Sequence, residues 1–264
     1  MSAISKSKAR DSWWLRALPS ISVLLFLVLW EAVVRLGAIR PIVLPAPSAI
    51  LNYLVAMTVD GSIPYNLGVT FLRIIAGFFV AGSLGILVGI LMGMSRVVAR
   101  VLDPWIAALY PLPKISLIPL LIIWLGTGEV YILTISAISA FFPVVMSTYA
   151  GIRQIDQNLI RAACDLGANA RQVQMKVVVP AAIPSIFSGL QLGMGVTIIL
   201  VVAAEMIGGS TQSGMGYLLI RFGQVMETEK VFAGLLVLAV FGAIVIKSQA
   251  FFERLVAPWA IGKE

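Results

Sequence analysis

Long apolar runs recur along this sequence, and each is long enough to cross a lipid bilayer. The hydrocarbon core of a bilayer is about 30 Å thick, which an α-helix of about 20 residues spans. Hydrophobic residues make up 60% of the 264 positions and charged residues only 12%, whereas soluble domains contain about 25% charged residues. The mean hydropathy is +1.01. We therefore predict an all-α membrane protein that forms one transmembrane domain over residues 1–264, and we exclude a water-soluble fold.

The residue types that are missing exclude most catalytic chemistry. The sequence has no histidine and a single cysteine, Cys164, so it has no disulfide framework, no Cys/His zinc site and no histidine-based triad. Its only Gly-Lys pair, at 262–263, lies in the C-terminal tail and is not part of a phosphate-binding loop. We expect no enzyme activity, no metal and no cofactor in this chain, so any ATP must be bound by a partner subunit.

The apolar runs predict six membrane spans and one shorter helix. The third span carries four prolines, which forbid a straight helix, so it is predicted to be broken. A short apolar stretch over 47–57 is too short to span and is predicted to lie at the membrane interface. The six predicted spans are 20–39, 67–94, 104–125, 130–150, 185–208 and 231–251.

The basic residues predict the orientation of these spans. Cytoplasmic segments of membrane proteins carry an excess of Lys and Arg. If both termini are cytoplasmic, the external segments keep only Arg40, Arg221 and Lys230. The cytoplasmic segments then collect Lys6, Lys8, Arg10, Arg16, Arg96, Arg100, Arg153, Arg161, Arg171, Lys176, Arg254 and Lys263. The positions of the basic residues thus reflect the orientation of the chain in the membrane, and they give no reason to expect a nucleic-acid partner.

Four glycines at small intervals mark the second span. Gly82, Gly85, Gly89 and Gly93 show the small-xxx-small spacing that lets another helix approach closely. A nucleotide-binding fingerprint would need a preceding strand, and none is expected here. We therefore predict that these glycines serve helix packing.

The longest polar segment, 151–183, lies in a predicted cytoplasmic loop. Asp156 is a candidate helix N-cap, Gly167 a candidate C-cap, and Asn169 a candidate cap for a second helix that Pro180 ends. The segment thus predicts a helix, a tight turn and another helix. The apolar spans on either side argue against a DNA-binding helix-turn-helix, and a plain solvated connector is the alternative.

The first predicted helix of this loop has the residue pattern of a small protein-docking surface. Ala162, Ala163 and Leu166 are expected to form a compact apolar edge at helical spacing. Arg161 and Asp165 flank this edge with charge. Such an arrangement favours docking over the role of a connector.

Ionisable residues inside the spans are the remaining candidates, because a charge in hydrocarbon is costly and is usually paired or faces a cavity. Glu31 and Arg35 are four residues apart and are expected to pair. Arg73 and Lys114 are candidates for the path of an anionic substrate, with snorkelling to the interface as the alternative. Glu205 has no basic neighbour at helical spacing, so we expect a partner on another helix or a protonated side chain, in a structural network near a gate.

The loop carries a resemblance to a known family. Its pattern of Ala162-Ala163, three residues, Gly167, nine residues, Val177, one residue and Val179-Pro180 resembles the E-A-A-x3-G-x9-I-x-L-P loop of importer permeases of the ATP-binding cassette class. Arg161 stands where the general pattern has Glu, although an arginine is familiar there in one subfamily. The segments "LPAPSAI", "LDPWIAALYPLPKISLIPLLIIWLGTGE", "FFPVV" and "VVAAEMIG" resemble that subfamily, which imports aliphatic sulfonates and taurine, with nitrate importers as relatives.

The resemblance implies a fold, a location and a set of partners. It implies the type I importer permease fold, similar to that of methionine-importer permeases, in the bacterial inner membrane. The loop would hold a coupling helix that docks on a cytoplasmic ATPase, a second permease copy would complete the pathway, and an external solute-binding protein would deliver a small anion. A secondary transporter driven by an ion gradient is the alternative, because such proteins also contain broken helices and midplane acidic residues.

Overall fold

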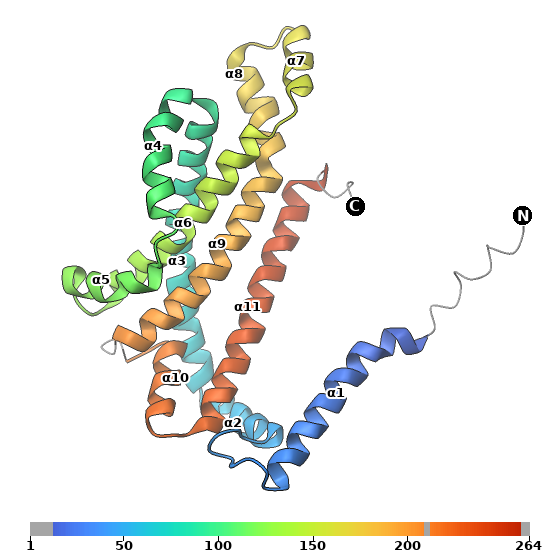
Figure 1. Ribbon diagram of the computed structural model, residues 1–264, viewed down its shortest axis with the longest axis vertical. Helices are drawn as coiled ribbons and strands as arrows, with labels where there is room; N and C mark the ends of the chain where they lie inside the picture. The colour runs from blue at the N-terminus through green and yellow to red at the C-terminus, as the bar shows by residue number, and fades with distance from the viewer. Residues whose placement is uncertain (1–12, 209–211, 260–264) are drawn as a thin grey trace, which may run out of the picture.

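All the regular secondary structure in the described part of the chain is helical. A computed structural model describes residues 13–208 and 212–259, with side chains from residue 18 onward. No strand occurs within those two ranges. Figure 1 shows a bundle of long helices with shorter helices at both ends. The elements are α1 (Trp13–Arg35), α2 (Pro47–Val59), α3 (Ser62–Met94), α4 (Arg96–Leu109), a 3₁₀ turn (Lys114–Leu117), α5 (Ile118–Leu125), α6 (Glu129–Arg153), α7 (Gln157–Asp165), α8 (Ala170–Val173), a π-helical turn (Gln174–Val178), α9 (Val179–Gly208), α10 (Met215–Gln224) and α11 (Thr228–Val256).

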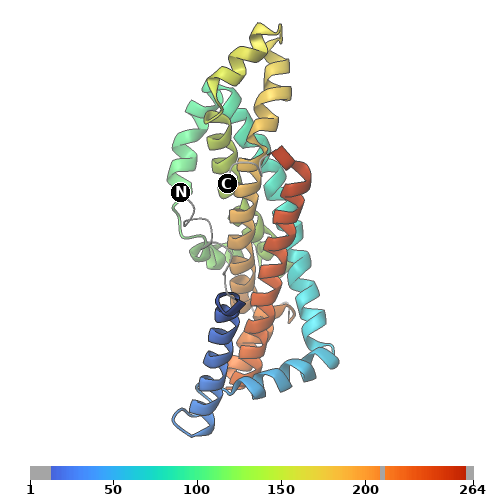
Figure 2. The ribbon, with the colours of Figure 1, turned by 90° about the vertical axis from the view of Figure 1, so that its right-hand side faces the viewer.

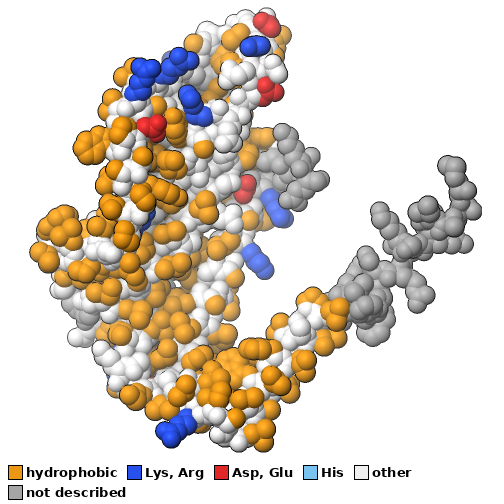
Figure 3. Space-filling model, in the orientation of Figure 1, with side chains coloured by type: hydrophobic (Ala, Val, Ile, Leu, Met, Phe, Trp, Pro, Cys, Tyr) orange, Lys and Arg blue, Asp and Glu red, His pale blue; other side chains and the backbone are white. Residues whose placement is uncertain are grey.

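Five of the described helices are long and apolar enough to cross a membrane, or six spans if α4 and α5 count as one bent span. The predicted spans 67–94, 130–150 and 231–251 lie within α3, α6 and α11. One end of the bundle carries α7 and α8, which we call the hairpin end, and the opposite end carries α2 and α10 (Figure 1). Lys and Arg side chains gather toward the hairpin end on the face drawn in Figure 3.

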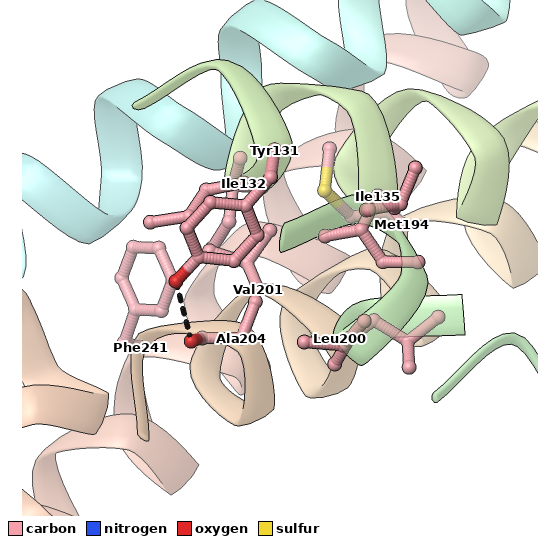
Figure 4. Packing of buried hydrophobic residues seen from close by; sticks show 11 residues of the cluster. Tyr131, Ile132, Ile135, Met194, Leu200, Val201, Ala204 and Phe241 are labelled. Carbon is pink, nitrogen blue, oxygen red and sulfur yellow. Dashed lines mark hydrogen bonds between the residues drawn. The ribbon is translucent and has the colours of Figure 1, made fainter. Parts of the chain in front are cut away.

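The centre of the bundle is made by α3, α6 and α9. The central helix, α6, lies against both of the others along much of its length. Ile132, Ile135 and Val201 are fully buried between these helices. Tyr131 lies among them, and its hydroxyl donates a hydrogen bond of 2.9 Å to the Ala204 carbonyl (Figure 4). This bond fixes how far α6 and α9 slide along each other, because an unmade buried bond would be costly.

The glycines of α3 allow this close packing. A Cβ atom added to Gly89 would lie 2.6 Å from the Thr148 Cβ of α6, and one added to Gly85 or Gly93 would also meet α6 side chains, at 3.0 and 2.6 Å. Gly82 instead faces α9, where its nearest side-chain atom would be 3.2 Å away. The predicted role of this stripe in helix packing is confirmed.

The proline-rich third segment is broken, as expected, but not where the prediction 104–125 began. The helix starts earlier, at the first residue of α4, and Pro104 lies inside it. The break comes at residues 110–113, which include Pro111 and Pro113, and the chain then bends by 86° into the segment that contains α5. Two prolines within three residues remove backbone donors that one helix would need, whereas the isolated Pro104 is tolerated.

The prediction that Pro180 ends a helix is wrong. The chain passes from α8 through the π-helical turn into α9, and Ala170–Gly208 forms one apolar stretch of 39 residues. The Val179 N–H bonds to the Gln174 carbonyl, which is the wider i to i+5 spacing. This wider turn directly precedes Pro180 and makes room for its ring, which would clash with a carbonyl in a regular α-helix.

The first two helices lie at the edge of the molecule. The short helix α2, which contains the predicted interfacial segment 47–57, crosses the end of the bundle opposite the hairpin (Figure 2). From there α1 diverges from the bundle and is covered with apolar side chains (Figure 3). It ends at Arg35, earlier than the predicted 20–39. The expected pair of Glu31 and Arg35 is confirmed at 2.5 Å, and Glu31 also accepts a bond of 2.7 Å from the Ser48 hydroxyl.

The glycine packing leads to a test with a matched control on the same helix. We expect Gly89→Ala to destabilise the protein by about 1–3 kcal/mol, because its methyl group would overpack against α6. Gly68→Ala should be neutral or stabilising, since nothing lies within 4 Å of that position and alanine favours helix. Thermal unfolding of the detergent-purified variants measures both effects. Equal unfolding temperatures for the two variants would contradict the packing role.

Candidate functional site

The polar loop folds into a capped helical hairpin. The Asp156 carboxylate accepts a bond of 2.9 Å from the Asn158 N–H at the start of α7. Gly167, at φ +83°, ends α7, and the amides of Gly167 and Ala168 bond back to carbonyls of the last turn at 2.9 and 3.1 Å. Asn169 and Gln172 form a reciprocal capping box at the start of α8. The caps predicted at Asp156, Gly167 and Asn169 are thus all confirmed, and they hold the turn rigidly.

The two faces of α7 differ. Leu159, Ala162 and Leu166 recur at helical spacing and are exposed, and Leu166 is 89% exposed. Ala163 is predicted to lie on the exposed apolar edge with Ala162, but it packs inward against buried residues of α8 and α9. Adjacent residues of a helix point in directions about 100° apart, so Ala162 and Ala163 cannot face the same way. Leu159 takes the place of Ala163 in the exposed apolar stripe. The charged neighbours Arg161 and Asp165 are both exposed.

The hairpin is anchored to the bundle by a small hydrophobic core of its own. Ile152 from α6, Val173 from α8, and Ala182 and Ile186 from α9 are buried there, and Ile160 of α7 packs against them. A shallow hollow of about 350 Å³ lies beside Leu166 between the arms of the hairpin. The hairpin is therefore a stiff projection with an exposed apolar stripe, continuous with α9 through the π-helical turn Gln174–Val178.

At the opposite end of the bundle, Glu205 of α9 is fully buried in a hydrogen-bond network. Its carboxylate accepts a bond of 2.8 Å from Arg73 Nη1 and one of 2.9 Å from the Gly216 N–H. The Thr70 hydroxyl lies 2.9 Å from both carboxylate oxygens and accepts a bond of 2.8 Å from the Met215 N–H. The sequence required a partner for Glu205 on another helix, and Arg73 of α3 is that partner.

Arg73 is itself only 3% exposed, so it does not snorkel to the interface. Besides Glu205, its Nη1 donates to the Ser213 carbonyl at 2.9 Å, and its Nε donates to Glu129 Oε2 at 2.8 Å. Its Nη2 pairs with the other oxygen of Glu129, which is the first residue of α6. The bidentate contact with Glu129 was not predicted from the sequence.

The network holds the start of α10, a short helix that the sequence analysis missed. The first amides of this helix region have no partners within their own helix, so neighbouring side chains accept from them. Asn66 accepts from the Gly214 N–H at 2.7 Å, next to the bonds that Thr70 and Glu205 accept. A signal was present, since Asn66, Thr70 and Arg73 form a polar stripe at helical spacing on an otherwise apolar span.

Lys114 lies apart from this network. Its ammonium group donates a bond of 3.0 Å to the Tyr110 carbonyl and lies 5.3 and 5.4 Å from the ring centroids of Tyr110 and Phe142. Across the described ranges it shares no hydrogen bond or ion pair with Arg73. The two cations proposed for an anion path are therefore not joined in one site. In the same ranges, no group of three or more His, Cys, Asp or Glu residues could hold a metal ion.

The buried network leads to a second test. We expect Glu205→Gln to destabilise the protein by about 1.5–3 kcal/mol, since it removes a charged acceptor that three donors share. Glu129 would still neutralise Arg73, which keeps the loss below that of a fully stranded charge. The control is Glu227→Gln, which breaks a half-exposed pair with Lys230 and should cost less than about 1 kcal/mol. Thermal unfolding in detergent measures both, and equal losses would argue against the network.

Comparisons with known proteins agree with this architecture. Residues 85–258 match the family described as binding-protein-dependent transport system inner membrane component. The chain is 33% identical to a putative aliphatic sulfonates transport permease protein of Bacillus subtilis, over 97% of this chain and 92% of the relative. It is 35% identical to the taurine transport system permease protein of Escherichia coli, over 88% of this chain and 86% of the relative.

Solved structures show the same fold. An amino acid ABC transporter matches with a TM-score of 0.59 and 18% identity, covering 78% of this chain and 97% of that one. The MetNI methionine ABC transporter matches with a TM-score of 0.55 and 19% identity, covering 70% and 93%. The predicted type I importer permease fold is confirmed. The chain belongs to the family of inner-membrane components of binding-protein-dependent transport systems.

Proposed function

We propose that this chain is the permease subunit of an ATP-driven importer, and that it moves a small solute across the membrane by alternating access. The observation that carries this proposal is the α7–α8 hairpin, a rigid projection with an exposed apolar stripe at one end of the bundle. ATP is bound and hydrolysed by a separate cytoplasmic subunit, which docks on Leu159, Ala162 and Leu166. Arg161 and Asp165 border this surface and contribute charge complementarity.

The hairpin is suited to transmit force. Caps at both of its helices, its own hydrophobic core and its continuity with α9 mean that a push on α7 reaches a membrane-spanning helix directly. A flexible connector would absorb such a push instead. Closure of the ATPase subunits on ATP would thus tilt the spans and turn the pathway outward, and hydrolysis would reset it.

The substrate that we propose is a small anion such as a sulfonate or taurine. Two relatives named for aliphatic sulfonates and for taurine support this class. An external solute-binding protein delivers the substrate, in keeping with the family's description as binding-protein-dependent. We also propose that two copies of this chain pair, with lipid against the remaining apolar surface. The alternative, a gradient-driven secondary transporter, would need no ATPase and no exposed hairpin.

The turn of the hairpin offers a test in which the same position supplies the control. Gly167 has φ +83° and open space around it, so only the backbone conformation resists substitution. We expect Gly167→Val to lose most uptake and to release the ATPase subunit, because a β-branched residue is strained in the left-handed region. Gly167→Asn should keep both functions, since asparagine tolerates that region. Co-purification from native membranes and uptake by cells measure the two outcomes.

If both Gly167 variants keep a bound ATPase and normal uptake, the hairpin is not the coupling element. If no ATP-hydrolysing subunit accompanies the wild-type protein and purified vesicles show gradient-driven uptake, the secondary transporter is correct.

The exposed stripe gives an independent test. Leu166→Ser should weaken co-purification of the ATPase by tenfold or more while leaving the unfolding temperature unchanged, because the side chain is 89% exposed in the isolated chain. Leu36→Ser is the matched control, since Leu36 is 84% exposed and follows α1 at the opposite end of the bundle. Equal ATPase recovery from both variants would place the docking surface elsewhere.

A further inference from the structure

The guanidinium of Arg73 has two sides with different surroundings. On one side, Nη1 faces the buried carboxylate of Glu205 and the Ser213 carbonyl, at 2.8 and 2.9 Å. On the other side, the Nε and Nη2 atoms both point at the two oxygens of Glu129. This second edge presents two parallel N–H donors, the geometry that guanidinium uses to bind carboxylate, sulfonate or phosphate oxygens in pairs.

Glu129 is not needed to balance the charge of Arg73. Glu205 is fully buried and already pairs with Arg73. A second ionised carboxylate therefore gives the cluster one more negative than positive charge, in a setting where each charge is costly. Nor does the α10 network depend on Glu129, because the acceptors for the first amides are Asn66, Thr70 and Glu205.

Glu129 is also the charged partner of Arg73 that is free to leave. Its side chain is 56% exposed, whereas that of Glu205 is fully buried. It follows a short loop that contains Gly126 at φ +77° and Gly128 at φ +153°, two conformations that other residues rarely adopt. The hydrogen bonds that its carboxylate accepts within the described ranges come from Arg73. Glu129 can therefore move away without opening the core.

We propose that the Nε–Nη2 edge of Arg73 is an anion-binding site that the carboxylate of Glu129 fills in this conformation. An oxyanion of the transported solute replaces Glu129 there when the half-exposed side chain of Glu129 turns toward solvent, while the buried Tyr131 and Ile132 keep the start of α6 in place. Glu129 then acts as a competitor built into the chain, which returns to Arg73 and expels the anion. This inference rests on the proposed function for its substrate class and adds to it the residues that select an anion.

The exchange suits a transport cycle. A permanently open guanidinium would hold an anion tightly in a site of low dielectric, and tight binding slows release. A carboxylate of the same chain, tethered beside the site, competes at high effective concentration and keeps occupancy brief. Glu205 holds Arg73 in place throughout. The Nε–Nη2 edge of Arg73 therefore keeps its orientation whether Glu129 or the solute is bound to it.

The test measures anion binding to the purified permease, without its partners, at constant ionic strength. Methanesulfonate is titrated against chloride, and the rise in unfolding temperature gives an apparent affinity. We expect Glu129→Gln to bind methanesulfonate at least roughly tenfold more tightly than the wild type, because the competing charge is gone. Glu227→Gln is the control, since it removes a similarly exposed carboxylate at the same end of the bundle and should behave as the wild type.

Arg73→Lys in the Glu129→Gln background should abolish the gain, because an ammonium group lacks the two-pronged edge. In cells, Glu129→Gln should lower both the KM and the maximal rate of uptake, since release slows. The proposal is overturned if Glu129→Gln and the wild type bind methanesulfonate equally, or if the gain survives Arg73→Lys in a variant that still unfolds cooperatively. Co-purification of the ATPase with Glu129→Gln is scored separately, so its loss would count against the proposed function and not against this site.

Discussion

A backbone amide inside a membrane has no water to bond, and this constraint governs how the ends of the broken helices are built. Where α10 begins, the amides of Gly214, Met215 and Gly216 need acceptors from other elements. Asn66 and Thr70 of α3 and Glu205 of α9 provide them. The short helix α10 therefore depends on polar side chains from two other helices, α3, which is distant in the sequence, and the end of α9.

The use of a charged acceptor at Glu205 has a physical reason. Its carboxylate receives donors from Thr70, Gly216 and Arg73 at once and has no hydrogen of its own to satisfy. An amide in its place would carry an NH₂ group that needs further acceptors in a crowded site. The carboxylate in turn requires a cation, because an unpaired charge there would be prohibitive. The unpaired amides of α10 therefore require the Glu205 carboxylate, and the carboxylate in turn requires Arg73.

How well the sequence predicts each part depends on the range of the interactions that decide it. The caps at Asp156, Gly167 and Asn169 depend on bonds within a few residues, so the hairpin was predicted closely. The contact between Arg73 and Glu129 joins residues 56 positions apart, and the two α3 side chains that hold α10 lie 148 and 145 positions away from the amides that they accept from, so neither feature has a local signature. Pro180 was misjudged because a π-helical turn accommodates it, and no residue type demands such a turn.

The two ends of the molecule are connected by a single element. The helical stretch Ala170–Gly208 carries the hairpin's second arm at its start and Glu205 near its other end. At about 1.5 Å of rise per residue, a helix of this length reaches across the whole bilayer. It packs closely on α6, where Gly193 would place a Cβ 3.2 Å from a backbone oxygen, so it has little room to bend. A displacement of the hairpin must therefore tilt the helix as a unit. The helix carries Glu205 near its far end, and Arg73 of α3 binds both Glu205 and Glu129 at the start of α6, so the hairpin and this network are linked through a single continuous helix.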